Sequence, residues 1–187
     1  MKITIITAVS RPENLELVHK SIFIGTVFSK IEYEWFIVED GNSLVGKKFL
    51  SNIRYLSYPT GGVCGHPQIN KALDEIDSGY VYILDDDNIL HNNLFVMAQK
   101  LLGDSNKALI STQIYKNGII RLSPEADNIK RCHIDSAQFL VPRDMIGNLR
   151  WENQKEADGI FFSKIYKKYK ERFVITDEIL CYYNYLR

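Results

Sequence analysis

The sequence predicts an α/β protein, a three-layer α/β/α sandwich with a mostly parallel central sheet and a small mixed C-terminal part. Segments rich in Ile, Val, Tyr and Phe recur about one helix length apart, which is typical of βαβ units. The chain has 187 residues, enough for one substantial core. Its content of 45% hydrophobic and 25% charged residues is ordinary for a globular protein. We therefore expect a single domain over residues 1–187.

The first half of the chain contains the expected parallel strands. Pro12 suits the opening turn of a helix, and apolar residues follow it at near-helical spacing. A second helix is expected to begin after Pro67 and to end at Ser78-Gly79, where glycine can adopt the left-handed conformation. Runs of β-branched and aromatic residues predict strands at residues 3–8, 34–39, 53–57 and 80–84.

The second half of the chain is expected to be mixed rather than purely parallel. Asn117-Gly118 is a typical hairpin turn between two apolar segments. The predicted elements are a helix at about 92–102, strands at 108–115, 119–122 and 138–141, a helix at 156–170, and closing strands at 173–175 and 180–185.

Charge and cysteine content exclude several classes of partner. Lys+Arg and Asp+Glu both number 23, so the chain lacks the positive field that non-specific nucleic-acid binding requires. Three widely spaced cysteines fit reduced thiols and a cytoplasmic location. No apolar segment is long enough for a transmembrane helix.

The last predicted helix carries a run of basic residues: Lys164, Lys167, Lys168, Lys170 and Arg172. We interpret this run as a solvated face, with weak contact to an anionic membrane as the alternative.

Three carboxylates, Asp85, Asp86 and Asp87, follow directly after the strand at 80–84. Open α/β sheets place their ligand crevice at the carboxyl ends of strands. Adjacent carboxylates repel one another unless a cation neutralises them, and hard oxygen donors suit Mg²⁺ or Mn²⁺. In extended backbone, Asp85 and Asp87 point to one side and Asp86 to the other. The stretch predicts a divalent metal site, and an acidic turn that caps the next helix is the alternative.

The second strand also ends in acidic residues. Glu39 and Asp40 precede the turn-forming residues Gly-Asn-Ser at 41–43. A carboxylate here could accept hydrogen bonds from an imide N–H or from ribose hydroxyls, whereas a turn with solvated acids is the alternative. The glycine-rich loop at 60–67, which contains Gly62, allows the backbone to approach a phosphate or sugar closely.

Two more acids, Glu156 and Asp158, open the last long helix. The helix dipole favours acids in the first turn, so stabilisation of the helix competes with a role as general base. Trp151 could present a flat face to a sugar ring or pack in the core. The residue types of a hydrolase triad occur at 133–136 without the nucleophile elbow that such a triad needs, and we assign them no role.

Together, these segments resemble the GT-A glycosyltransferases, particularly the nucleotide-diphospho-sugar transferases of families 2 and 43. Residues 3–12 look like the first strand and nucleotide loop of these families, and residues 35–40 look like the second strand, whose terminal acid meets the uracil ring. Residues 70–73 and 79–88 resemble a helix followed by the metal-binding DxD segment, and Ala157-Asp158 is similar to the Glu-Asp base motif of family 2. The resemblance spans most of the chain and implies a GT-A (Rossmann-like) fold.

The resemblance also implies a metal-dependent, inverting glycosyltransferase that moves a sugar from a UDP-sugar to a hydroxyl of a glycan or other acceptor. Mn²⁺ or Mg²⁺ would stabilise charge on the leaving diphosphate, and a carboxylate on the opposite side would take the acceptor proton. Residues 1–90 would be the nucleotide-sugar-binding half and residues 91–187 the acceptor-binding half. The resemblance implies that Asp87 binds the metal, with Asp85 as a second candidate, and that Asp158 removes the proton, with Glu156 as the alternative. It implies acceptor contact by Trp151. The residues implied to bind the nucleotide-sugar are Thr7, Ala8, Arg11, Asp40, Gly62, Asp85 and Asp86.

Two other functions are compatible with the sequence. A sugar nucleotidyltransferase would use a related sheet, but it normally has a Gly-Gly-x-Gly loop after the first strand, where this chain has Ala8-Val9-Ser10-Arg11. A non-catalytic nucleotide-sugar-binding module would bind UDP together with a metal ion but would not release UDP from any donor sugar.

Overall fold

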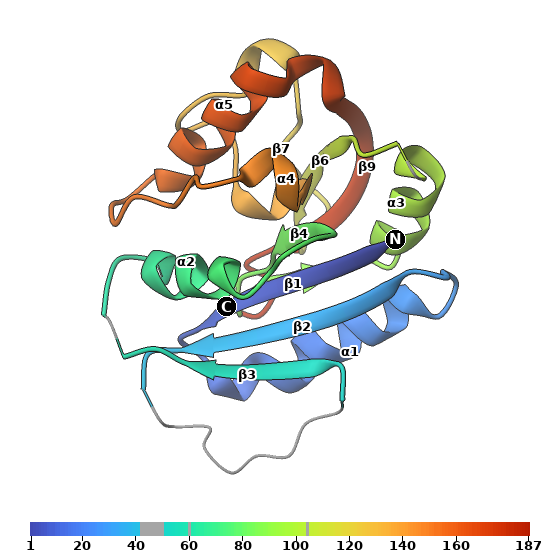
Figure 1. The fold of residues 1–187 in the computed structure, drawn as a ribbon. Helices are drawn as coiled ribbons and strands as arrows, with labels where there is room; N and C mark the ends of the chain where they lie inside the picture. The colour runs from blue at the N-terminus through green and yellow to red at the C-terminus, as the bar shows by residue number, and fades with distance from the viewer. Residues whose placement is uncertain (42–50, 60, 104) are drawn as a thin grey trace.

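The computed structural model describes residues 1–41, 51–59, 61–103 and 105–187 (Figure 1). The N-terminal part of its sheet consists of parallel strands in the order β3-β2-β1-β4. These strands are β1 (Lys2–Val9), β2 (Glu32–Glu39), β3 (Ile53–Ser57) and β4 (Tyr80–Ile83). The chain builds outward from β1 through β2 to β3 and then returns to place β4 on the other side of β1. The carboxyl ends of β1 and β4 therefore flank a topological switch point, where sheets of this kind bind ligands.

The C-terminal part of the sheet is mixed, as predicted. From β4 the order continues through β8, β6, β9 and β5, with β7 paired to β6. β8 is antiparallel to both β4 and β6, whereas β6 and β9 are parallel. The bounds are Ile89–Leu90 for β5, Ala108–Tyr115 for β6, Ile120–Leu122 for β7, Phe139–Pro142 for β8 and Phe173–Tyr183 for β9.

Helices cover both faces of the sheet, so the predicted three-layer architecture is confirmed (Figure 1). Ile3 and Ile5 of β1 pack with α1 (Leu15–Thr26) and α3 (Leu94–Leu102) on one face. Ile6 packs on the other face, which is covered by α2 (His66–Asp74), α4 (Arg143–Ile146) and α5 (Ala157–Tyr169). Short 3-10 turns complete the elements: η1 (Pro12–Asn14), η2 (Ala126–Asn128), η3 (Ser136–Gln138) and η4 (Lys170–Arg172).

Most predicted boundaries shift by one or two residues, the short elements β5 and α4 were not predicted, and two larger differences have a structural cause. α2 ends at Asp74 rather than at Ser78-Gly79. Gly79 instead has φ +87° beside β1, where a Cβ would lie 2.9 Å from the carbonyl oxygen of Lys2. The two predicted closing strands are one strand, β9, because shifts in its register against β6 accommodate the polar residues at 176–178 without ending the pairing.

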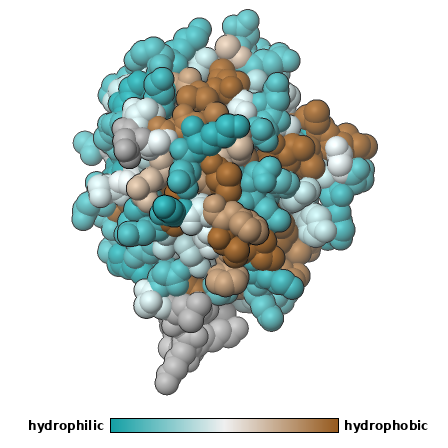
Figure 2. Space-filling view, turned by 90° about the vertical axis from the view of Figure 1, so that its right-hand side faces the viewer, coloured by the Kyte–Doolittle hydropathy of each residue, from teal (hydrophilic) through white to brown (hydrophobic). Residues whose placement is uncertain are grey.

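Hydrophobic side chains also reach the surface. Figure 2 shows them gathered among hydrophilic ones on the side of the molecule that carries α3 and the C-terminal end of α1. Within the described part of the chain, no helix combines the length and apolar character needed to cross a bilayer.

Candidate functional site

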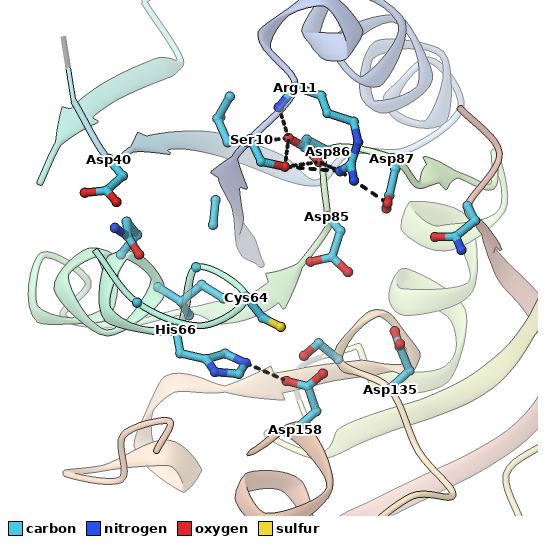
Figure 3. A pocket seen from close by; sticks show the side chains of 18 of the residues that line it. Ser10, Arg11, Asp40, Cys64, His66, Asp85, Asp86, Asp87, Asp135 and Asp158 are labelled. Atoms are coloured by element: carbon cyan, nitrogen blue, oxygen red, sulfur yellow. Dashed lines mark hydrogen bonds and ion pairs between the residues drawn. The ribbon is translucent and has the colours of Figure 1, made fainter. Parts of the chain in front are cut away.

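A pocket of about 490 Å³ opens at the carboxyl ends of β1 and β4, at the topological switch point (Figure 3). Most of the site residues predicted from the sequence line it, although they come from different segments: Ala8, Arg11, Asp40, Gly62, Asp85, Asp86, Asp87 and Asp158. The parallel strands bring the first seven to one edge of the sheet, and α5 places Asp158 opposite them.

Asp86 anchors the loop that follows β1. Its buried Oδ2 accepts hydrogen bonds from the backbone N–H groups of Ser10 and Arg11. The Arg11 Nη1 donates to Oδ1 at 2.8 Å, and the side chain of Asn14 donates to the Asp86 carbonyl at 3.0 Å. Both carboxylate oxygens are therefore engaged by the protein, a positioning role that the sequence did not reveal.

Asp87 is buried beside two arginines. Its Oδ2 lies 2.6 Å from Nε of Arg187 and 3.4 Å from Nη1 of Arg11. The backbone N–H of Leu186 also donates to the Asp87 carbonyl at 3.0 Å. The segment after β9 therefore lies against the acidic segment after β4, a contact between residues about a hundred positions apart.

Asp85 has a different environment from its two neighbours. No side chain in the described ranges forms a hydrogen bond or ion pair with its carboxylate, which faces the pocket (Figure 3). Burial raises the pKa of Asp85 well above its usual range, and the negative charges of Asp135 and Asp158 raise it further. A cation or a proton bound here would relieve this repulsion.

Asp158 lies in the first turn of α5 and faces Asp85 across the pocket. The indole Nε1 of Trp151 donates to its Oδ1 at 2.8 Å, and Nε2 of His66 lies 3.8 Å from the same oxygen. Burial raises the pKa of Asp158 and Asp135 adds to this, while hydrogen bonds from Ser136 and Trp151 oppose it. A carboxylate with a raised pKa is a stronger base, so Asp158 is suited to accept a proton.

Trp151 does not form the predicted acceptor platform. It is only 4% exposed and stacks on Phe161, with ring centroids 3.5 Å apart and planes 14° apart. The carboxamide of Asn70 binds both the N–H and the C=O of Trp151, each at 2.8 Å. The prediction was wrong because neighbouring aromatic rings bury this tryptophan, and its polar edge instead holds Asp158.

Two further predictions were wrong. Glu156 lies outside the pocket lining, on the surface, where it pairs with Nε of Arg131 at 2.7 Å. Its φ of +62° places it just before the helix rather than inside it. Thr7 is fully buried within the sheet, and its Oγ1 accepts a hydrogen bond from Nε1 of Trp35 at 2.9 Å. Thr7 therefore supports the strand and does not face a ligand.

The glycine-rich loop packs closely against the end of β1. Gly65 has φ +70°, and a Cβ at this position would collide with the Cβ of Ala8. The backbone N–H of Gly61 donates to Oδ1 of Asp40 at 2.9 Å, which joins the loop to the end of β2. The remaining predicted turn and loop residues lie outside the described ranges: Asn42, Ser43 and Thr60.

The pocket also contains residues to which the sequence had given no role. Asp135 accepts hydrogen bonds from Nε2 of Gln113 at 3.1 Å and from Nη1 of Arg121 at 2.8 Å. It also forms a capping box with Gln138, and the Asp-x-x-Gln spacing could have indicated a held turn. Several other unpredicted lining residues have no comparable local signal, among them Cys64, His66, Ser136, Tyr183, Asn184 and Arg187.

A divalent cation fits the chemistry of this pocket. Asp85 and Asp87 offer hard oxygen donors of the kind that Mg²⁺ and Mn²⁺ prefer, and a positive neighbour would stabilise the charged form of Asp85, whose carboxylate has no hydrogen-bond or ion-pair partner among the described residues. Among the described residues, no three His, Cys, Asp or Glu side chains are arranged to hold a metal by themselves. A cation held by Asp85 and Asp87 would complete its coordination with oxygens from a ligand or water.

Comparison with known proteins shows a fold relationship. No family model matches the chain. No curated protein matches it. Among solved structures, S. aureus TarS 1–349 in complex with UDP superposes with a TM-score of 0.75 at 17% identity over 97% of this chain. The same protein in complex with UDP-GlcNAc gives 0.74 at 19% identity over 97%. Mannosyltransferase PcManGT from Pyrobaculum calidifontis, in complex with GDP-Man and Mn²⁺, gives 0.65 at 12% identity over 95%.

These likenesses identify the fold as that of the GT-A glycosyltransferases, as the sequence resemblance implied. The chain spans 60% of the TarS structure with UDP, 58% of that with UDP-GlcNAc and 55% of the mannosyltransferase.

Proposed function

We propose that this chain is a metal-dependent, inverting glycosyltransferase that moves a sugar from a UDP-sugar to a hydroxyl of a glycan or other acceptor. The observation that supports this most is the pocket at the switch point, where strand-end acids face Asp158. Related folds in complex with UDP-GlcNAc and with GDP-Man and Mn²⁺ support the same class of donor.

The acceptor chemistry is assigned to Asp158. Its carboxylate takes the proton of the acceptor hydroxyl while that oxygen forms a bond to the anomeric carbon of the sugar. The bond from the anomeric carbon to the diphosphate oxygen breaks, its electron pair leaves with UDP, and attack from the opposite face inverts the anomeric centre. The indole of Trp151 holds the base through its hydrogen bond, and the ring of His66 lies beside the same carboxylate oxygen.

The donor chemistry is assigned to the ends of β1 and β2 and to the loop before α2. Arg11 and Asp40 line the pocket together with Ala8 and would bind the nucleoside. Gly62 lines the same pocket, has φ +135° and lies so close to the ring of Pro67 that a Cβ would collide with it, so the loop backbone rather than a side chain would face the donor here.

A divalent cation would be held by Asp87, with Asp85 as the second candidate. When bound, Mn²⁺ or Mg²⁺ would supply positive charge next to the leaving diphosphate. Arg187 contacts the Asp87 carboxylate, so a cation at Asp87 would compete with this ion pair. Arg11, which is bound to Asp86, keeps a second positive charge at the same end of the pocket.

A screen of nucleotide-sugars with Mn²⁺, first by thermal shift and then by assay of nucleotide release, tests the proposal. We expect a UDP-sugar to raise Tm in the presence of Mn²⁺ and to yield free UDP. Asp87→Ala is expected to abolish the Mn²⁺-dependent turnover while the protein remains folded.

The outcomes separate the alternatives. Pyrophosphate formed from a sugar phosphate and a nucleoside triphosphate would identify a nucleotidyltransferase instead. Binding of UDP without release from any donor would identify a binding module. Undiminished sugar transfer by Asp87→Ala would exclude the assigned metal site.

A further inference from the structure

The outer face of α1 is apolar although it is exposed to solvent. The inner face packs in the core through Val18 and Ile22, both fully buried. A cluster of exposed apolar side chains on a soluble domain marks an interaction surface, so this face is expected to have a partner. Half of the strongly exposed large hydrophobic side chains in the described residues lie on this helix and the two residues after it: Leu17 at 50%, Phe23 at 56%, Ile24 at 36%, Val27 at 57% and Phe28 at 81% exposure.

The charge around this face is positive. Between the exposed Glu16 in the first turn of α1 and the exposed Glu32 at the start of β2 the chain contains no Asp or Glu, and none occurs in residues 88–103, which include all of α3. The backbone N–H of Lys30 donates to Oε1 of Gln99 at 3.2 Å, so the segment after α1 lies beside α3. Figure 2 shows this side of the molecule, where hydrophobic patches lie among hydrophilic side chains. Its exposed cations are Lys20, Lys30 and Lys100.

A hollow of about 450 Å³ adjoins the helix and has the same character. Leu17 and Ile24 line it together with Lys20 and Lys116. The remaining walls include the rings of Tyr182 and Tyr185, aromatic side chains with one polar edge that suit a boundary between water and an apolar phase. The segment at 182–187 separates the hollow from the pocket of the proposed site and contributes side chains to both.

We propose that α1 and the adjoining hollow dock on an anionic lipid surface. The exposed apolar side chains of α1 enter the boundary between head groups and acyl chains, and the lysines bind the anionic head groups. A second copy of the chain fits this face less well, because a symmetric dimer would set the same lysines against one another. In this arrangement the segment at 182–187 lies between the membrane and the pocket. The docking does not depend on the proposed reaction.

Co-sedimentation with vesicles tests the docking. We expect the protein to bind vesicles of phosphatidylcholine mixed with phosphatidylglycerol, to bind phosphatidylcholine alone weakly, and to be released by high salt. The double variant Phe23→Ser and Phe28→Ser is expected to weaken binding at least about tenfold, because both rings lose their apolar contact with lipid. Lys20→Gln is expected to weaken it about fivefold.

The basic face of α5 provides the matched control. Lys167→Gln with Lys168→Gln removes two exposed charges on that face and is expected to leave vesicle binding unchanged. Thermal melting checks that each variant is folded, which is expected because all the substituted side chains are exposed. Absence of binding by the wild type, equal binding by the phenylalanine variant, or dependence on the α5 lysines would overturn the proposal. So would a dimer in solution that the phenylalanine substitutions dissociate.

Discussion

At the scale of single residues, neighbouring carboxylates have separate tasks because their partners differ. Asp86 is held by backbone N–H groups and Arg11, whereas Asp87 is paired with Arg187. Asp85 and Asp158 face the pocket, and burial raises the pKa of both. Groups with pKa values shifted in this way are typical of catalytic sites. Asp158 is the one that is also positioned by a hydrogen bond from an indole.

Asp158→Asn tests the assignment of the base. We expect turnover to fall by roughly two to four orders of magnitude with donor affinity little changed, because the amide cannot accept the acceptor proton. Glu156→Gln is the matched control, since Glu156 pairs with Arg131 on the surface and is expected to leave turnover unchanged. Steady-state kinetics and donor titration measure both effects. A larger loss with Glu156→Gln would show that the wrong acid was chosen.

Trp151→Phe tests how the base is held. Phenylalanine retains an aromatic ring against Phe161 but removes the N–H that stabilises the charged form of Asp158. The pKa of Asp158 then rises further, and since the base must be deprotonated, the acid limb of kcat/KM moves to higher pH. Trp35→Phe removes the indole bond to Thr7, away from the site, and is expected to leave this limb in place. An unchanged acid limb in Trp151→Phe would show that the indole serves packing alone.

At the scale of elements, the contact between the glycine-rich loop and β1 shapes the donor side of the pocket. The loop leads into α2, and Asn70 of α2 binds the backbone of Trp151 in the segment before α5. A displacement of the loop would therefore disturb both the donor wall and the support of Asp158. Gly65 is the point at which the loop touches β1.

Gly65→Ala tests this contact. We expect a loss of roughly 1–3 kcal/mol of unfolding free energy, together with weaker donor binding, because the new Cβ collides with Ala8 and the backbone is left-handed. Gly61→Ala is the matched control, since Gly61 has φ +58° but open space around its Cβ position. It carries the backbone strain without the collision. Urea unfolding and donor titration compare the two variants, and equal donor affinities would show that the contact does not shape the site.

At the scale of the whole molecule, a net charge of zero conceals an uneven distribution. Acidic residues that follow β2 and β4 converge on one pocket with acids from the turn before η3 and from α5. The face formed by α1 and α3 is apolar and basic, and the segment at 182–187 lies between the two. Parallel strands explain the first gathering, because their carboxyl ends meet at one edge of the sheet.

Local sequence patterns determined the order of the elements, the mixed second half and the acids at the strand ends, because periodicity and turn residues act over short distances. They also indicated two acids at the start of α5, of which the family resemblance selected Asp158 as the proposed base. Only the tertiary structure decided that Trp151 supports this base, that Thr7 and Glu156 lie away from the pocket, and that Asp135 and Arg187 enter it. Burial and charge pairing between residues distant in the chain depend on which elements pack together. A local sequence pattern does not specify those partners, and this is the physical reason for the difference.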